Sequence, residues 1–156
     1  MRGEIYGIHL HYYLLLTMHI LYEQPGFTIL HDPDNCWLYV MWQGKRTAQV
    51  SQACCEMMLE QVRATHSYKI LNDGSLDLDG WSDLVGWVGQ DFFDLLADEG
   101  VVAVAWVVPR NLRALTDVHK VMTAVTRPAV STFGDIEGAY IWLNKSPGIS
   151  HEPANC

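Results

Sequence analysis

A run of carboxylates between Lys69 and Arg110 is the part of this chain best equipped for chemistry. No Lys or Arg falls inside it, and its eight acids are Asp73, Asp77, Asp79, Asp83, Asp91, Asp94, Asp98 and Glu99. The formal net charge of the chain is −8, so this segment carries the entire excess. Clustered carboxylates can coordinate a cation, transfer protons as an acid–base pair, or mark a surface that faces a partner.

A calcium loop is the most specific of these interpretations, and the spacing argues against it. If Gly80 were the central glycine of an EF-hand loop, Ser75, Asp77 and Asp79 would be ligands, but the final position, which needs a bidentate Glu, is Gly86. We therefore predict solvated carboxylates and no metal centre. A weak contact of these carboxylates with a divalent cation is the alternative.

No pairing of nucleophile and base marks an enzyme. The chain has no Walker or dinucleotide-binding glycine pattern. It has no nucleophile elbow, and His119 is as readily a surface residue as a base. Nothing in the sequence singles out one carboxylate as buried. We predict a non-enzymatic protein without a cofactor.

The composition is that of a globular protein. With 156 residues, 49% of them hydrophobic and 18% charged, the chain fits one domain with a sizeable core. The ten bases are scattered and the net charge is negative, so we do not expect nucleic-acid binding. Four cysteines, of which Cys54 and Cys55 are adjacent, form no framework, and we expect a reducing, cytoplasmic location.

Two terminal segments flank the expected domain. Ile8–Tyr22 is apolar but contains three histidines and is too short to span a bilayer. We assign residues 1–19 to an N-terminal arm, residues 20–145 to the domain and residues 146–156 to a flexible tail. Two interpretations of the arm stay open: sequence upstream of a true start at Met18, or an extra edge strand or docking arm.

The elements that would position these groups alternate between strands and helices. The turn residues 32–35 separate the β-rich runs Phe27–His31 and Cys36–Trp42, which predicts a hairpin. After it we expect helix Thr47–Thr65, strand Tyr68–Leu71, helix Trp81–Ala97 capped by Asp79 or Ser82, strand Val101–Val108, a helix that begins at Pro109, strand Ala129–Phe133 and helix Asp135–Asn144. The order β-β-α-β-α-β-α-β-α predicts an α/β fold with a mostly parallel five-stranded sheet and an antiparallel hairpin at its edge.

This fold would place a site at the carboxyl ends of the strands, where open α/β sheets bind ligands. Asn72 and Asp73 follow the third expected strand and Arg110 follows the fourth, so these three are candidates for binding a ligand or partner. Trp106, within the fourth strand, is a candidate to line a pocket between sheet and helix. A plain core position is the alternative for Trp106.

The expected helix Trp81–Ala97 carries two aromatic residues outside its apolar stripe. Trp87 and Phe93 lie off the stripe and have Asp83, Asp91 and Asp94 near them. One interpretation is an exposed aromatic patch with an acidic rim, as in a protein interface. The other is a wide buried face under a large sheet.

Several segments resemble the STAS-like fold, in its SpoIIAA-like branch of small bacterial proteins, over about residues 20–145. They are the hairpin with Trp42, Lys69–Asp73 (KILND), Trp87–Phe93 (WVGQDFF), Ala105-Trp106 and Thr132–Leu143 (TFGDIEGAYIWL). The branch is akin to the CRAL-TRIO lipid-transfer fold. The resemblance implies a regulatory protein rather than an enzyme.

The same resemblance implies a phosphorylation switch. In anti-sigma antagonists of this fold, a Ser at the start of the helix after the third strand is phosphorylated, and Ser75 and Ser82 are the candidates here. A phosphate adds about −1.5 to −2 charge at neutral pH. The chain departs from the family pattern, because Asn72-Asp73-Gly74-Ser75 replaces an Asp-Ser-Ser-Gly-like motif. Helix capping by Ser82 or Asp79 is the alternative role.

Two functions follow as hypotheses. The first is a regulatory or scaffolding module that binds a protein partner, or itself as a homodimer, through the acidic, aromatic-rich helix and loop. The second is a carrier or sensor of a small apolar or lipid-like ligand, which requires an enclosed apolar cavity of at least a few hundred Å³.

Overall fold

In the part of the chain that the structure describes, six strands form one sheet, and their order in space follows their order along the chain. The computed structural model describes residues 12–78 and 81–146. The strands are β1 (His19–Gln24), β2 (Phe27–Asp32), β3 (Trp37–Gly44), β4 (Lys69–Asp77), β5 (Ala103–Val107) and β6 (Ala129–Phe133). Strands β1 to β3 form an antiparallel meander, and β3 to β6 run parallel.

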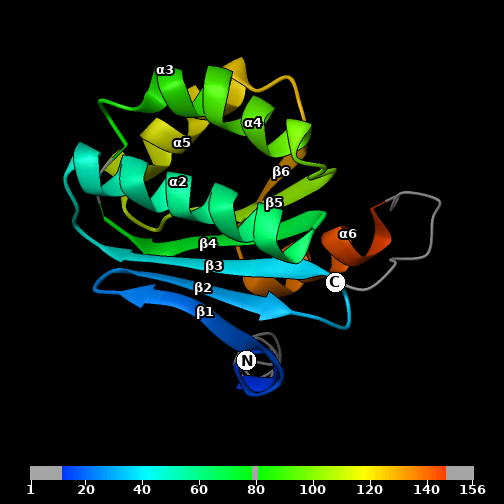
Figure 1. Cartoon of the computed structure of the whole chain (residues 1–156). Helices are drawn as coiled ribbons and strands as arrows, with labels where there is room; N and C mark the ends of the chain where they lie inside the picture. The colour runs from blue at the N-terminus through cyan, green and yellow to red at the C-terminus, as the bar shows by residue number, and fades with distance from the viewer. Residues whose placement is uncertain (1–11, 79–80, 147–156) are drawn as a thin grey trace.

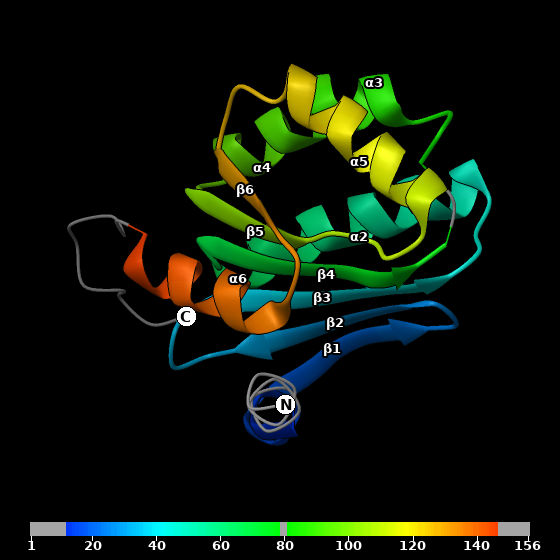
Figure 2. The ribbon, with the colours of Figure 1, turned by 180° about the vertical axis from the view of Figure 1, so that it is seen from behind.

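Helices cover both faces of this sheet. The helices are α2 (Ala48–Thr65), α3 (Val85–Trp87), the π-helical turn η1 (Val88–Phe92), α4 (Phe93–Asp98), α5 (Leu112–Ala124) and α6 (Ile136–Lys145). The helices that connect the parallel strands, α2 to α5, lie together on one face (Figure 1). The view from behind shows α6 on the opposite face (Figure 2). The carboxyl ends of β3 and β4 therefore open toward the start of α2.

The expected α/β class and mostly parallel sheet are confirmed, with one more strand than the sequence indicated. The additional strand is β1, which pairs antiparallel with β2. Gly26, in the turn between them, has a φ of +80°, and a Cβ atom there would lie 2.7 Å from the carbonyl oxygen of Gln43. Only glycine fits this turn without strain. Residues 1–11 and 147–156, most of the expected arm and tail, lie outside the described residues.

Strand β4 is longer than predicted and takes up the first part of the expected acidic loop. It runs to Asp77 rather than Leu71, because it pairs with β3 as far as Gly44, across an irregularity between Asp73 and Leu76. Asp73 and Asp77 are thus buried strand residues. The sequence suggested a loop there because carboxylates are seldom buried unless they are paired.

The predicted helix Trp81–Ala97 begins later, at Val85, and contains a π-helical turn. The Phe93 N–H donates to the Val88 carbonyl oxygen, five residues back. This wider turn brings Phe93 onto the face of Val88, and the helix buries both. No side chain caps its first residue, so the predicted cap by Ser82 was wrong, and Asp79 lies outside the described residues.

Side-chain caps fix the starts of the other long helices. Thr47 accepts from the Val50 N–H at the start of α2, and Asp135 accepts from the Gly138 N–H at the start of α6. Helix α5 begins at Leu112 with Asn111 as its cap. The prediction that it begins at Pro109 was wrong, because the chain is still extended at Asn111.

Candidate functional site

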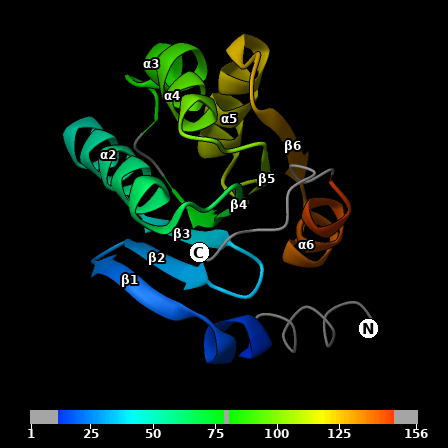
Figure 3. The same ribbon diagram turned by 45° about the vertical axis from the view of Figure 1, so that its right-hand side comes forward.

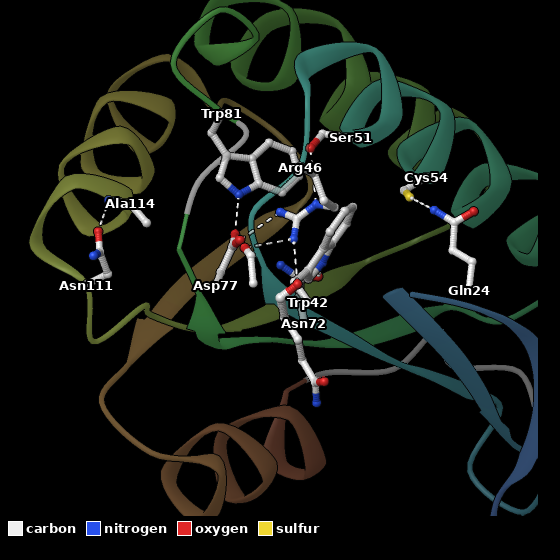
Figure 4. Close-up of polar contacts among 12 residues, drawn as sticks. Gln24, Trp42, Arg46, Ser51, Cys54, Asn72, Asp77, Trp81, Asn111 and Ala114 are labelled. Atoms are coloured by element: carbon white, nitrogen blue, oxygen red, sulfur yellow. Dashed lines mark hydrogen bonds and ion pairs between the residues drawn. The ribbon is translucent and has the colours of Figure 1, made fainter. Parts of the chain in front are cut away.

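A buried ion pair lies at the carboxyl edge of the sheet. Arg46 Nη2 is 2.7 Å from Asp77 Oδ1, and 2% of each side chain is exposed. Arg46 Nε also donates to Ser51 Oγ in α2, at 3.2 Å, and Nη1 donates to the Gln43 carbonyl oxygen, at 3.2 Å. Figure 4 shows the guanidinium enclosed between the end of β3, the end of β4 and α2.

Two tryptophans enclose this pair. The Arg46 guanidinium carbon lies 4.9 Å from the centre of the Trp42 ring and 5.8 Å from that of Trp81. Trp81 Nε1 donates to Asp77 Oδ2, the second oxygen of the carboxylate. Because the cation and the carboxylate neutralise each other, this cluster fixes the loops at the edge and is not arranged as an acid–base pair.

Beneath the pair, the aromatic core leaves little space. Trp42 Nε1 donates to Asn72 Oδ1 at 2.7 Å, and the ring of Trp81 lies 4.8 Å from that of Trp42 and 6.4 Å from that of Trp106. The cavity that these four residues help to line measures about 20 Å³, room for about one water molecule. Asn72 and Trp106, both candidates from the sequence, thus occur together in a filled core.

The third candidate from this edge, Asp73, lies on the other face of the sheet. Asp73 Oδ2 accepts from the Tyr39 hydroxyl at 3.0 Å, and Oδ1 accepts from the Ser75 N–H at 3.0 Å. Burial, with the adjacent Asp73, raises the pKa of Tyr39. Asp73 is therefore separated from Asn72 by the sheet itself, because neighbouring side chains of a strand point to opposite faces.

Two predicted contact residues differ sharply in exposure. Phe93 is only 3% exposed and belongs to the main core, with its ring 5.9 Å from that of Trp106. Of the two interpretations, the buried face is therefore confirmed for Phe93 and its place in an exposed aromatic patch is wrong, and the π-helical turn is the reason. Trp87 is half-buried and stacks on Phe92 at 5.5 Å. Of the predicted aromatic patch, only part of the Trp87 ring is therefore exposed.

The candidate switch residues also have different surroundings. Ser82 is exposed, and its hydroxyl donates to Asp117 Oδ2 on α5 at 2.8 Å. Ser75 is half-buried within β4, and its carbonyl oxygen accepts from the Arg110 N–H at 3.3 Å. Ser75 and Arg110 therefore lie side by side at the carboxyl edge, whereas Ser82 lies in the loop that leads to α3.

Four of the eight acids in the acidic segment form ion pairs with bases from elsewhere in the chain. Arg127 lies 3.1 Å from Asp94 Oδ1 and 2.7 Å from Asp98 Oδ1, and Arg63 lies 2.6 Å from Glu99 Oε1. With Asp77 paired to Arg46, the carboxylates of this segment do not form one acidic surface. The sequence could not show this, because every basic partner lies outside the segment.

The carboxyl edge instead presents exposed leucines, which the sequence analysis missed. Leu76 is 53% exposed, Leu78 is 41% exposed and Leu112 is 76% exposed. Leu76 is the penultimate residue of β4, Leu78 directly follows that strand, and Leu112 is the first residue of α5, which follows β5. The signal in the sequence was the alternation of Leu76, Asp77 and Leu78, which places the leucines on the face opposite the buried Asp77.

Among the residues that the structure describes, cysteines and metal ligands add no further site. Cys54 and Cys55 are free and buried, and burial raises the pKa of Cys54 to about 11. Cys36 is disulfide-bonded, so the cytoplasmic location stays a prediction, since disulfides are rare in reducing compartments. Within residues 12–78 and 81–146, no group of three or more His, Cys, Asp or Glu is placed to bind a metal.

A second hollow lies at the amino ends of the strands. It is an open groove of about 280 Å³ whose lining includes Ala103, Ala129, Trp142 and Lys145. Next to it, Lys69 is buried, and its Nζ donates to the carbonyl oxygens of Leu143 and Ser146, both at 2.7 Å. Burial lowers the pKa of Lys69. This lysine completes the C-terminal turn of α6.

Comparison with models of protein families, with curated proteins and with solved structures found no match to the chain. The STAS-like resemblance therefore stays a hypothesis. No helix in the described part of the chain is long and apolar enough to cross a membrane.

Proposed function

We propose that the chain is a non-enzymatic regulatory or scaffolding module that binds an apolar segment of a protein partner at the carboxyl edge of its sheet. The observation that carries this proposal is the exposure of Leu76 and Leu78 at the end of β4 and of Leu112 at the start of α5. The hydrogen bond from the Arg110 N–H to the Ser75 carbonyl oxygen brings these two segments together. Apolar side chains gathered at a surface, with polar residues around them, are typical of protein interfaces.

The edge is held rigidly, which favours a binding role. Asp77 lies between Leu76 and Leu78 and is anchored to Arg46 and Trp81. The Leu78 N–H also donates to the Gly44 carbonyl oxygen at 3.0 Å. A surface whose backbone is fixed before binding loses less conformational entropy when the partner arrives.

Basic side chains flank the leucines. Lys45 follows β3, and Arg110 and Arg113 lie on either side of Leu112, all three exposed. Such a rim favours a partner whose apolar segment carries acidic residues, because complementary charges steer association. This surface replaces the acidic helix as the proposed contact, since Asp94, Asp98 and Glu99 have partners within the chain.

The STAS-like resemblance supports a regulatory version of the same proposal. Ser75 precedes Leu76, and its carbonyl oxygen is bonded to the backbone of Arg110. A phosphate on Ser75 would add about −1.5 to −2 charge beside the leucines and would oppose an acidic partner. Ser82 is the second candidate, and its effect would pass through Asp117.

The carrier hypothesis has less support. A carrier needs an enclosed apolar cavity of a few hundred Å³, and the cavity under the tryptophans measures about 20 Å³. The larger groove at the amino ends is open to solvent. Binding of a small apolar ligand remains an untested alternative.

Site-specific photocrosslinking tests the proposal. A benzoylphenylalanine would replace Leu112 and, in a control variant, Ile141, an exposed apolar residue on α6. We expect a discrete protein adduct in cells from position 112 and none from position 141, and Leu76→Lys should abolish that adduct. The proposal would be wrong if both positions gave the same adducts, or if position 112 gave none.

A further inference from the structure

Strand β1 lies at one end of the sheet. Among the residues that the structure describes, β1 pairs only with β2. Figure 3 shows β1 at the outer limit of the sheet, away from α2 to α5. Edge strands expose unpaired N–H and C=O groups, and monomeric proteins commonly protect them with Lys or Pro. The sequence of β1, HILYEQ, contains neither, although the pairing of β1 with β2 is irregular between Ile20 and Tyr22.

Apolar side chains are concentrated beside this edge. The helical residues 12–17 lead into β1, and Leu14 anchors them because it is fully buried. The neighbouring side chains of Leu16 and Ile20 are 79% and 60% exposed, and Tyr12 and Tyr13 are also exposed. So many large apolar side chains in nine residues mark an interaction surface.

Charge favours a second copy of this chain as the occupant. The net charge of −8 disfavours an anionic lipid surface, and it would also repel another copy at most faces. Residues 12–24 contain one acid, Glu23, and no Lys or Arg. The edge of β1 is thus a surface on which two copies can meet with little electrostatic repulsion.

The faces of β1 suit pairing with itself. Its register with β2 pairs Ile20 with Leu30 and Glu23 with Thr28, on the face that α6 covers, and puts His19 and Gln24 on the other face. An antiparallel two-fold axis between Leu21 and Tyr22 would set Ile20 opposite Glu23 of the second copy and His19 opposite Gln24. Each opposed pair then shares a face, and no like charges meet.

We propose that two copies associate through antiparallel pairing of their β1 strands, which joins two six-stranded sheets into one. The exposed side chains of residues 12–20 pack at the junction. Such an isologous contact satisfies the edge of both copies at once and leaves no free β1 edge. The contact lies apart from the leucines of the carboxyl edge, so it is independent of the proposed partner binding.

Sedimentation velocity on the full chain tests this inference. We expect twice the 17.7 kDa mass of the monomer at micromolar concentration. Ile20→Lys and Leu16→Lys should each give a monomer with unchanged circular dichroism, because both side chains are exposed. Ile141→Lys, on α6, is the matched control and should remain a dimer.

Three results would overturn the inference: a monomeric wild type at high micromolar concentration, a dimer that persists in both β1-edge variants, or a monomer that floats with phosphatidylcholine vesicles. The last would assign the apolar residues to a membrane surface. This test is independent of the test of the proposed function. Dimerisation is measured by sedimentation of the Ile20 and Leu16 variants, whereas partner binding is measured by crosslinking at position 112.

Discussion

Arg46 and Asp77 are joined at 2.7 Å with only 2% of either side chain exposed, although 30 residues separate them in the chain. Removing one partner of a buried pair leaves the other charged and unpaired, which costs about 3–5 kcal/mol. We expect Arg46→Met and Asp77→Leu each to lower the free energy of unfolding by this amount, measured by urea denaturation.

The double variant Arg46→Met, Asp77→Leu should lose much less than the sum of the single losses, since it leaves no buried charge. Arg63→Met is the matched control, because the Arg63–Glu99 pair is largely exposed and is expected to contribute under about 1 kcal/mol. Additive losses in the double variant would show that the two residues stabilise the edge independently.

Phe93 and Trp87 should respond differently to truncation. Phe93 is enclosed by Phe92 and Trp106, and Phe93→Ala should cost about 3–5 kcal/mol of unfolding free energy. Trp87→Ala should cost distinctly less, because that side chain is half-buried. Equal losses in thermal or urea unfolding would contradict the arrangement of the π-helical turn.

Local signals in the sequence predicted part of the fold accurately. Helix α2 was predicted within one residue because Thr47 is a typical cap before a periodic apolar pattern, and β6 was predicted at its observed bounds. Asp135 marked the start of α6 in the same way. Each of these features is determined by residues that are close together in the sequence, in one helical turn or in one strand.

What the sequence missed depends on contacts between distant residues. Asp73 and Asp77 were predicted to be solvated because their partners, Tyr39 and Arg46, lie in an earlier part of the chain. Phe93 was placed off the buried stripe because ordinary helical spacing was assumed across a turn that is π-helical. The carboxyl edge was predicted as the site, yet its leucines were not, since exposure depends on the packed structure.

Ser82 provides a test of the switch hypothesis through Asp117. The Ser82 hydroxyl donates to the Asp117 carboxylate, which is itself buried. We expect Ser82→Ala to cost about 1–3 kcal/mol, because Asp117 loses a donor. Ser82→Asp should cost more, since two carboxylates would then meet. Melting temperatures should decrease from the wild type to Ser82→Ala and again to Ser82→Asp. If Ser82→Asp is as stable as Ser82→Ala, phosphorylation of Ser82 would not act by destabilising the fold.

Cys54 and Cys55 should be nearly inert in the folded protein. Burial raises the pKa of Cys54 from 9.0 to about 11, which leaves about a hundredfold less thiolate at pH 8, and burial also raises the pKa of Cys55. Since thiolate is the reactive form, iodoacetamide should modify the peptide containing both residues slowly in native buffer and rapidly in urea. Mass spectrometry measures both rates, and rapid native labelling would show that this part of α2 opens readily.

Lys69 should make stability depend on pH in the alkaline range. Burial lowers its pKa below 10.5 in the folded protein, so the unfolded chain binds more protons than the folded one between the two pKa values. Stability contributed by this group therefore rises with pH in that window. Lys69→Met removes the titration and keeps most of the side-chain stem. As pH rises from neutral toward 10.5, the unfolding free energy of the wild type should increase relative to that of Lys69→Met. If the two proteins show the same dependence of unfolding free energy on pH, the pKa of Lys69 is not lowered in the folded protein.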